Sequence, residues 1–153
     1  MGLGWRGDTQ MAQEWHQGDY LISTDPSRLD LDIVHGFLRR SYWAADRPPE
    51  TVRRSVEHSL NFGLYYTMDR RQVGFARVVT DFATFAWLCD VFIDEAHRGH
   101  GLGSWLTQTV VGYFRLEGLR LWVLATLDAH GLYEKVGFKP LGAPERWMEK
   151  RGP

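Results

Sequence analysis

The segment Leu88–Leu106 reads LCDVFIDEAHRGHGLGSWL, and the rest of the chain is organised around it. Its first residues are apolar and predict a strand, whereas its last residues have the spacing of an amphipathic helix. The glycine-rich turn Arg98–Gly103 lies between the two. The segment therefore predicts a strand, a glycine loop and a helix in direct succession.

A glycine loop in this position has a defined physical use. Glycine has no Cβ, so the backbone can adopt positive φ and come close to a ligand, while the first N–H groups of the helix remain free. These donors and the positive end of the helix dipole suit a phosphate or pyrophosphate group. Arg98 would add positive charge at the same place. We therefore expect a ligand that carries phosphate.

Of two common phosphate-binding motifs, the P-loop does not fit this loop, and the dinucleotide-binding motif fits it only at Gly99 and Gly101. A P-loop requires a Lys directly after its last glycine, but Gly103 is followed by Ser104 and Trp105. A dinucleotide-binding loop requires a third glycine where Ser104 stands, and an acidic residue about twenty positions later, where the chain has Leu121 and Trp122. The pattern that remains is Arg-x-x-Gly-x-Gly.

This pattern resembles the acetyl-CoA loop of the GNAT acyltransferases, which has the form Arg/Gln-x-x-Gly-x-Gly/Ala. Arg98, Gly101 and Gly103 match it. A second segment, Gly131–Phe138 with the sequence GLYEKVGF, is similar to the LYEKxGF segment of the same family and lies at the expected distance. The resemblance covers roughly residues 19 to 150, and it implies the fold, the co-substrate and several site residues.

The expected fold class is α/β (α+β), in a single GNAT-like domain. The resemblance implies a mixed central sheet of about six or seven strands with helices on both faces. We expect residues 1–18 to be an N-terminal arm and residues 19–153 to be the acetyltransferase domain. Hydrophobic periodicity predicts strands at 20–24, 62–68, 73–80, 84–93, 119–127 and 146–149, and helices at 29–40, 50–60, from 102 to a stop at Gly118, and at 129–136 with Asp128 as its N-cap.

Composition limits the classes of partner. The chain has 153 residues, 44% of them hydrophobic, and a formal net charge of −1, which suits one domain with a small-molecule ligand and argues against nucleic acid or an anionic membrane as partner. One cysteine, Cys89, excludes an internal disulfide and fits a reducing compartment. No long apolar run or signal-peptide pattern is present, and no metal-ligand spacing is present. We expect a cytoplasmic protein without a metal, either monomer or homodimer.

The resemblance assigns the acetyl-CoA contacts to the strand end and the loop. Phe92 and Ile93 would pair with the pantetheine arm as a further strand would, and the residues from Arg98 onwards would hold the pyrophosphate. The expected cofactor-binding residues are Phe92, Ile93, Arg98, Gly99, His100, Gly101, Leu102, Gly103 and Ser104.

Two residues are candidates for the catalytic groups. Tyr133 matches the tyrosine of the LYEKxGF segment, where a phenol faces the CoA sulfur and can donate a proton to the departing thiolate. Asp90 is the candidate base, because a carboxylate in a covered strand needs either a partner or a function. In the alternative, Asp90 is structural and either holds a bulge or positions Arg77. The base would then be an ordered water, Asp81 or Glu149.

The acceptor site is expected among aromatic side chains. Tyr42, Trp43, Arg77 and Trp147 are the candidate substrate contacts, and Tyr65 and Trp87 are further aromatic candidates. Aromatic residues favour a cationic or flat acceptor, whereas Arg77 favours a carboxylate-bearing one, and the sequence does not rank the two.

The resulting hypothesis is transfer of an acetyl group from acetyl-CoA to the primary amine of a small molecule, by direct attack in a ternary complex. Two alternatives remain open at this point. One is a non-catalytic acetyl-CoA-binding or regulatory module, and the other is a nucleotide-binding domain that uses the same glycines for ATP or NAD.

Overall fold

The computed structural model describes residues 11–153 and contains a six-stranded sheet whose spatial order follows the chain. Strands β1 to β5 are antiparallel neighbours, and β6 pairs with β5 in parallel. The strands are β1 (Glu14–Gln17), β2 (Tyr20–Ser23), β3 (Leu60–Tyr66), β4 (Arg71–Thr80), β5 (Phe85–Ile93) and β6 (Leu121–Val123). The mixed sheet confirms the predicted fold class.

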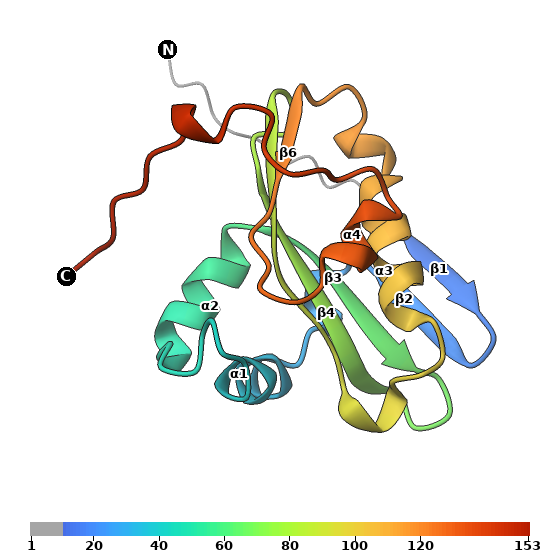
Figure 1. The fold of residues 1–153 in the computed structure, drawn as a ribbon. Helices are drawn as coiled ribbons and strands as arrows, with labels where there is room; N and C mark the ends of the chain where they lie inside the picture. The colour runs from blue at the N-terminus through green and yellow to red at the C-terminus, as the bar shows by residue number, and fades with distance from the viewer. Residues whose placement is uncertain (1–10) are drawn as a thin grey trace, which may run out of the picture.

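Helices cover both faces of the sheet, as Figure 1 shows. On one face lie α1 (Leu31–Arg39) and α2 (Pro49–Glu57), and on the other lie α3 (Leu102–Val111) and α4 (His130–Glu134). The described part of the chain also forms four short 3₁₀ turns: η1 (Pro26–Arg28), η2 (Glu95–His97), η3 (Phe114–Leu116) and η4 (Pro144–Arg146). The path β5–η2–α3–β6 contains the parallel crossover that the glycine-loop segment predicts.

Two apolar cores hold these layers together, one on each side of the sheet. On the α3 side, Leu106 and Val110 are fully buried against sheet residues such as Val78. The second core consists of α1 and α2 side chains against Phe75, whose ring also lies 5.8 Å from that of Phe92. Because successive residues of a strand face opposite sides, β4 and β5 contribute to both cores. The centre of the sheet is therefore packed on both faces where the site is built.

Local sequence explains the helix starts. The Asp30 carboxylate accepts a hydrogen bond from the Ile33 backbone N–H at 3.1 Å and caps α1. Pro49 occupies the first turn of α2, where its missing N–H costs nothing. Gly101 precedes α3 with φ of 72°, a conformation that favours glycine. The helix boundaries thus follow from caps and φ restrictions.

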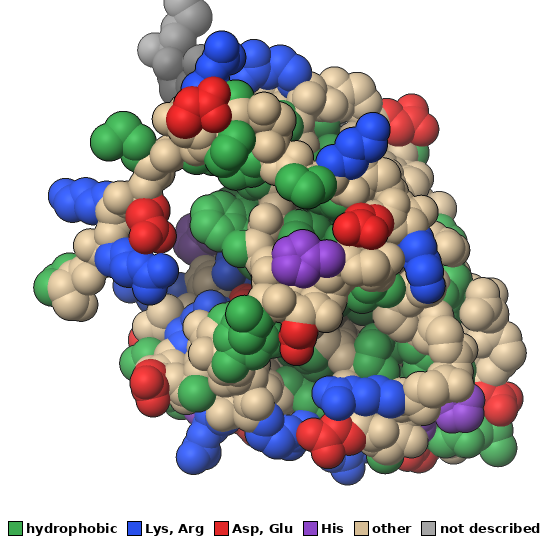
Figure 2. Space-filling model, in the orientation of Figure 1, with side chains coloured by type: hydrophobic (Ala, Val, Ile, Leu, Met, Phe, Trp, Pro, Cys, Tyr) green, Lys and Arg blue, Asp and Glu red, His purple; other side chains and the backbone are tan. Residues whose placement is uncertain are grey.

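Several boundary predictions are wrong. Residues 14–17, within the predicted arm, form edge strand β1, while residues 1–10 of that arm lie outside the described residues. The predicted last strand at 146–149 is absent: η4 ends at Arg146, and the segment after it extends away from the body (Figures 1 and 2). The expected nine-residue strand at 119–127 is reduced to the three residues of β6, whose pairing with β5 ends at Val123.

The start of α4 differs from the prediction as well. Ala129 is its N-cap residue and makes no side-chain cap, so the Asp128 side chain does not cap the helix. The Thr126 hydroxyl accepts a hydrogen bond from the Ala129 N–H at 3.0 Å instead. Asp128 is thereby left for another role. Within residues 11–153, no helix has both the length and the apolar character needed to cross a bilayer.

Candidate functional site

The site is built where β5 and β6 separate. Their pairing ends at Trp87 and Val123, and beyond it a cavity is lined on one side by β5 residues and on the other by residues 125–129. In the same part of β5, the register with β4 shifts by one residue, because Asp90 and Val91 together lie opposite Ala76. Asp90 has φ of 52°, as expected for a β-bulge. The bulge changes the direction of the side chains of β5 that line this cavity.

A first cavity of about 380 Å³ lies at the glycine loop. Eight of the nine predicted acetyl-CoA contacts line it: Phe92, Ile93, Arg98, Gly99, Gly101, Leu102, Gly103 and Ser104. Gly99 and Gly101 have φ of 85° and 72°, which side-chain-bearing residues rarely adopt. The guanidinium of Arg98 donates from Nε to the Ile93 carbonyl at 3.1 Å, which ties the loop to the end of β5.

His100 does not line this cavity. It is exposed, and its ring lies 6.4 Å from that of Tyr20 on β2. The neighbouring His97 makes a 2.8 Å hydrogen bond between its Nδ1 and the Tyr20 hydroxyl. Both histidines therefore lie on the outer side of the loop, and His97 anchors it to the sheet.

A second cavity of about 840 Å³ opens on the α1–α2 side of β5. Tyr42, Trp43, Arg77 and Trp87 line it, together with Arg47, Asp90 and Asp128. The Tyr42 hydroxyl accepts a hydrogen bond from the Leu127 N–H at 2.9 Å, which joins the α1–α2 loop to the segment before α4.

Two of the aromatic candidates lie elsewhere. Trp147 is in the extended C-terminal segment and does not line the cavity, while Tyr65 is buried in β3. Trp147 cannot serve the acceptor site from this position. The sequence indicated Trp147 only as an aromatic residue, and its position in the chain did not show that it lies away from the cavity.

Asp90 is the centre of a buried ionic cluster in the wall of the second cavity. Its Oδ2 accepts hydrogen bonds from Arg47 Nη1 and Arg77 Nε, both at 2.8 Å, and its Oδ1 accepts one from Trp43 Nε1 at 3.0 Å. The side chain of Asp90 is 2% exposed, against 23% for Arg47 and 13% for Arg77.

The charge state of Asp90 follows from these contacts. Burial alone would raise the pKa of its carboxyl group, but the hydrogen bonds and charges of the two arginines outweigh it and hold the pKa below its usual range. Asp90 is therefore a poor proton acceptor. The geometry favours the alternative role, in which it supports the bulge and positions Arg77.

Tyr133 lies on α4 and lines both cavities. Burial raises the pKa of its hydroxyl to about 12, with smaller contributions from Tyr42, Asp128 and Cys89. The phenol therefore carries its proton at neutral pH and can donate it. Val91 and Ala129 are the other residues common to the two cavities.

Three other side chains are unsuitable as the nucleophile or the base, because of their protonation state or their position. Burial raises the pKa of the Cys89 thiol to about 11, so it is not an activated nucleophile. The Asp81 carboxylate is bound within its own turn by Thr84 and Ala83, and Glu149 forms an exposed pair with Arg151 at 3.5 Å. Neither acid lines the second cavity.

Sequence reasoning missed two residues, Arg47 and Asp128. Arg47 precedes the Pro48-Pro49 pair in the loop that the resemblance gives to the acceptor wall, and this position was the available signal. Asp128 was interpreted as a helix cap, although it lines the second cavity. Neither belongs to a motif, so only the folded arrangement identifies them.

Comparison with known proteins agrees with this geometry. The sequence model of the acetyltransferase (GNAT) domain matches residues 61–140. The chain belongs to the GNAT acetyltransferase family. It is therefore an acyltransferase, and the predicted resemblance is confirmed.

Individual relatives support the assignment. A Gibberella zeae protein assigned as an acetyltransferase is 35% identical over 144 residues, with 80% of each chain covered. A crystal structure of a Xanthomonas campestris protein assigned to the GNAT family has 45% identity and a TM-score of 0.85, covering 90% of this chain and 96% of its own. A Clostridium acetobutylicum protein assigned as an acetyltransferase, whose structure contains acetyl-CoA, shares the fold at 14% identity and a TM-score of 0.63, with 86% and 94% covered.

Proposed function

We propose that this protein transfers an acetyl group from acetyl-CoA to the primary amine of a small molecule, by direct attack within a ternary complex. The observation that carries the proposal is the common wall of the two cavities. Val91, Ala129 and Tyr133 line both the glycine-loop cavity and the larger cavity beside it. Two substrates that occupy the two cavities would meet at these residues.

The glycine-loop cavity suits acetyl-CoA. Its free backbone N–H groups at the start of α3 and the Arg98 side chain would bind the pyrophosphate, and the end of β5 at Phe92 and Ile93 would pair with the pantetheine arm. The Clostridium acetobutylicum neighbour, which has the same fold, contains acetyl-CoA in its structure. Acetyl-CoA supplies a thioester, whose acetyl carbon is the electrophile.

The reaction requires one proton to be removed and one to be supplied. The amine nitrogen attacks the thioester carbonyl carbon, the C–S bond breaks, and the sulfur leaves as a thiolate. Tyr133 is suited to donate its phenolic proton to that sulfur, and the resulting phenolate regains a proton from solvent. The transfer then yields an amide and free CoA.

The proton of the amine needs an acceptor other than Asp90. The second cavity is lined by two carboxylates, and Asp90 is committed to both arginines. Asp128 is the other, and within residues 11–153 it has no ion-pair partner. We propose that the amine proton passes to Asp128 or to water in the cavity beside it.

Two measurements test the proposed function. Thermal shift with acetyl-CoA, CoA, ATP and NAD should give stabilisation by the first two ligands only, because a ligand stabilises the state that binds it. Release of free thiol in the presence of an amine library should then reveal turnover. Acetyl-CoA binding without thiol release for any amine would favour the non-catalytic module, and stabilisation by ATP or NAD alone would refute the acetyl-CoA site.

A further inference from the structure

The inner wall of the second cavity contains two arginines that share one carboxylate. Asp90 neutralises one positive charge, so the cluster of Arg47, Arg77 and Asp90 keeps a net charge of +1. Burying a charge without a partner is costly, although both guanidinium groups remain partly open to the cavity. One more negative charge, supplied by a bound anion, would therefore make the cluster neutral.

Hydrogen-bond donors are also left over. A guanidinium group has five N–H donors. Arg77 uses Nε for Asp90 and Nη1 for the Ser59 hydroxyl at 3.0 Å, and Arg47 uses Nη1 for Asp90. Arg77 also has a side-chain hydrogen bond with Cys89, whereas within residues 11–153 neither Nε nor Nη2 of Arg47 has a protein partner. A planar carboxylate is the anion that such donors bind best.

The cavity wall has a defined order along β5. Val91 lies at the junction with the glycine-loop cavity, Cys89 is paired with Arg77, and Trp87 is paired with Val79. Because Val91 and Asp90 both lie opposite Ala76, the distance is better counted along β4: at about 3.3 Å per residue, Arg77 lies about 3 Å beyond Ala76, and Val79 lies about 10 Å beyond it. Val79 and Trp87 are 42% and 49% exposed, so they offer an unoccupied apolar surface.

The opposite charge lies at the other side of the cavity. Asp128 adjoins Ala129 of the junction, and its charge contributes to the raised pKa of Tyr133, so its carboxylate acts on the place where the amine must react. A cation would find its counter-charge here. If the cation instead lay against the ring of Trp43, it would be close to the positively charged cluster of Arg47 and Arg77. The reason is that the Trp43 indole donates a hydrogen bond to Asp90, which belongs to the same cluster.

We propose that the acceptor is an amino acid with an apolar side chain. Its carboxylate binds Arg47 and Arg77, its amine lies at the junction beside Asp128, and its side chain lies along Val79 and Trp87. This inference rests on the proposed function and specifies the substrate class of that site. It ranks the two acceptor types that the sequence leaves open.

Matched acceptors test the inference directly. L-Phenylalanine, L-phenylalaninamide and 2-phenylethylamine share an aromatic body and a primary amine, and only the first has a carboxylate; L-leucine and L-leucinamide give a second pair. We expect kcat/KM for each amino acid to exceed that of its neutral analogue by about tenfold or more, the scale of one charge-assisted hydrogen bond. Equal values, or a preference for the neutral amines or for a diamine, would overturn the inference and leave the proposed function intact. Thiol release from no acceptor, amino acids included, would overturn both.

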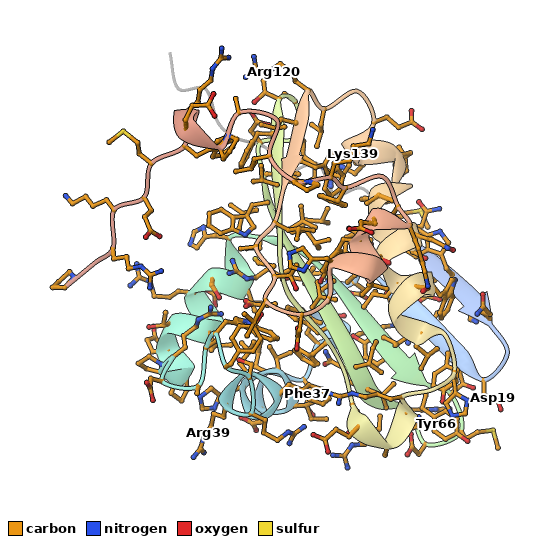
Figure 3. All side chains as sticks on the ribbon, in the orientation of Figure 1. Asp19, Phe37, Arg39, Tyr66, Arg120 and Lys139 are labelled. Carbon is orange, nitrogen blue, oxygen red and sulfur yellow. The ribbon has the colours of Figure 1, made fainter. Side chains whose placement is uncertain are left out.

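A charge variant separates recognition from folding. Arg47→Gln should lower kcat/KM for the amino acid about tenfold more than it lowers the value for its amide, whereas Arg47→Lys should retain part of the preference. Asp90 keeps Arg77 and Trp43 in both variants. The control is Arg39→Gln, since Arg39 is exposed on α1 and points away from the sheet (Figure 3). Loss of activity with acid and amide alike in a folded Arg47→Gln variant, judged by circular dichroism, would contradict carboxylate binding.

Discussion

Replacement of Asp90 by Asn distinguishes a structural carboxylate from a catalytic base. The change removes one negative charge and keeps the shape of the side chain. Asn also tolerates the positive φ of 52° at this position, so the bulge itself is not strained by the substitution. What remains is a buried amide between two guanidinium groups.

The expected cost follows from the contacts. Removing one partner of a buried ion pair costs about 3–5 kcal/mol, and the lower end applies here because Arg47 and Arg77 are partly open to water. For a chain of this size, a loss of about 3 kcal/mol corresponds to a decrease in Tm of about 6–12 °C. Asp46→Asn, an exposed change in the neighbouring loop, should alter stability by less than about 0.5 kcal/mol.

The pH dependence gives an independent check. The pKa of Asp90 is lower in the folded state, so its stabilising contribution is complete above the unfolded pKa near 3.9 and is lost as the pH falls through the folded pKa. The free energies of unfolding of wild type and Asp90→Asn should therefore differ by a constant amount at neutral pH and converge below about pH 4.

Urea unfolding between pH 3 and pH 8, together with the profile of kcat/KM against pH, measures both effects. The structural role predicts a destabilised variant whose remaining activity has the wild-type pH profile. A variant of unchanged stability that loses the acidic limb of the profile would refute the reasoning and restore Asp90 as the base.

Four further changes test other parts of the structure. Gly103→Val should abolish acetyl-CoA binding in calorimetry with the fold intact, since a Cβ there makes only ordinary contacts of 3.8 Å with Leu132 but fills the loop cavity; unchanged affinity would exclude the loop. Tyr133→Phe should lower kcat about 10- to 1000-fold with little change in acetyl-CoA affinity, and an unaltered kcat would leave Tyr133 a structural residue. Alkylation of Cys89 by iodoacetamide should be slow at pH 7.5 and rise with pH, because burial raises the pKa of the thiol to about 11; rapid reaction at neutral pH would contradict its burial. Gly36→Ala in α1 should stabilise the protein by about 0.5–1 kcal/mol, because the added Cβ meets no atom, and a lower urea midpoint would speak against this.

The parts of the fold that depend on local backbone chemistry were predictable from the sequence. The glycines at 99 and 101 adopt the positive φ that the loop requires, and the segment around them forms the expected strand, loop and helix. The failures concern segments whose state depends on distant partners. Residues 14–17 form a strand only because Tyr20–Ser23 lies beside them, and residues 146–149 have no strand partner within the described chain.

The sequence by itself determined the family and the glycine loop, since each is encoded in a short motif with its own backbone requirement, and the second motif predicted a role for the phenol of Tyr133. The tertiary structure decided the contacts and the charge environment of Asp90. Its ligands Trp43 and Arg47 lie 47 and 43 positions away and approach it only when the α1–α2 loop packs over the bulge of β5. The charge state of a buried carboxylate is set by such neighbours, and the spacing of residues along the chain does not predict which neighbours these are.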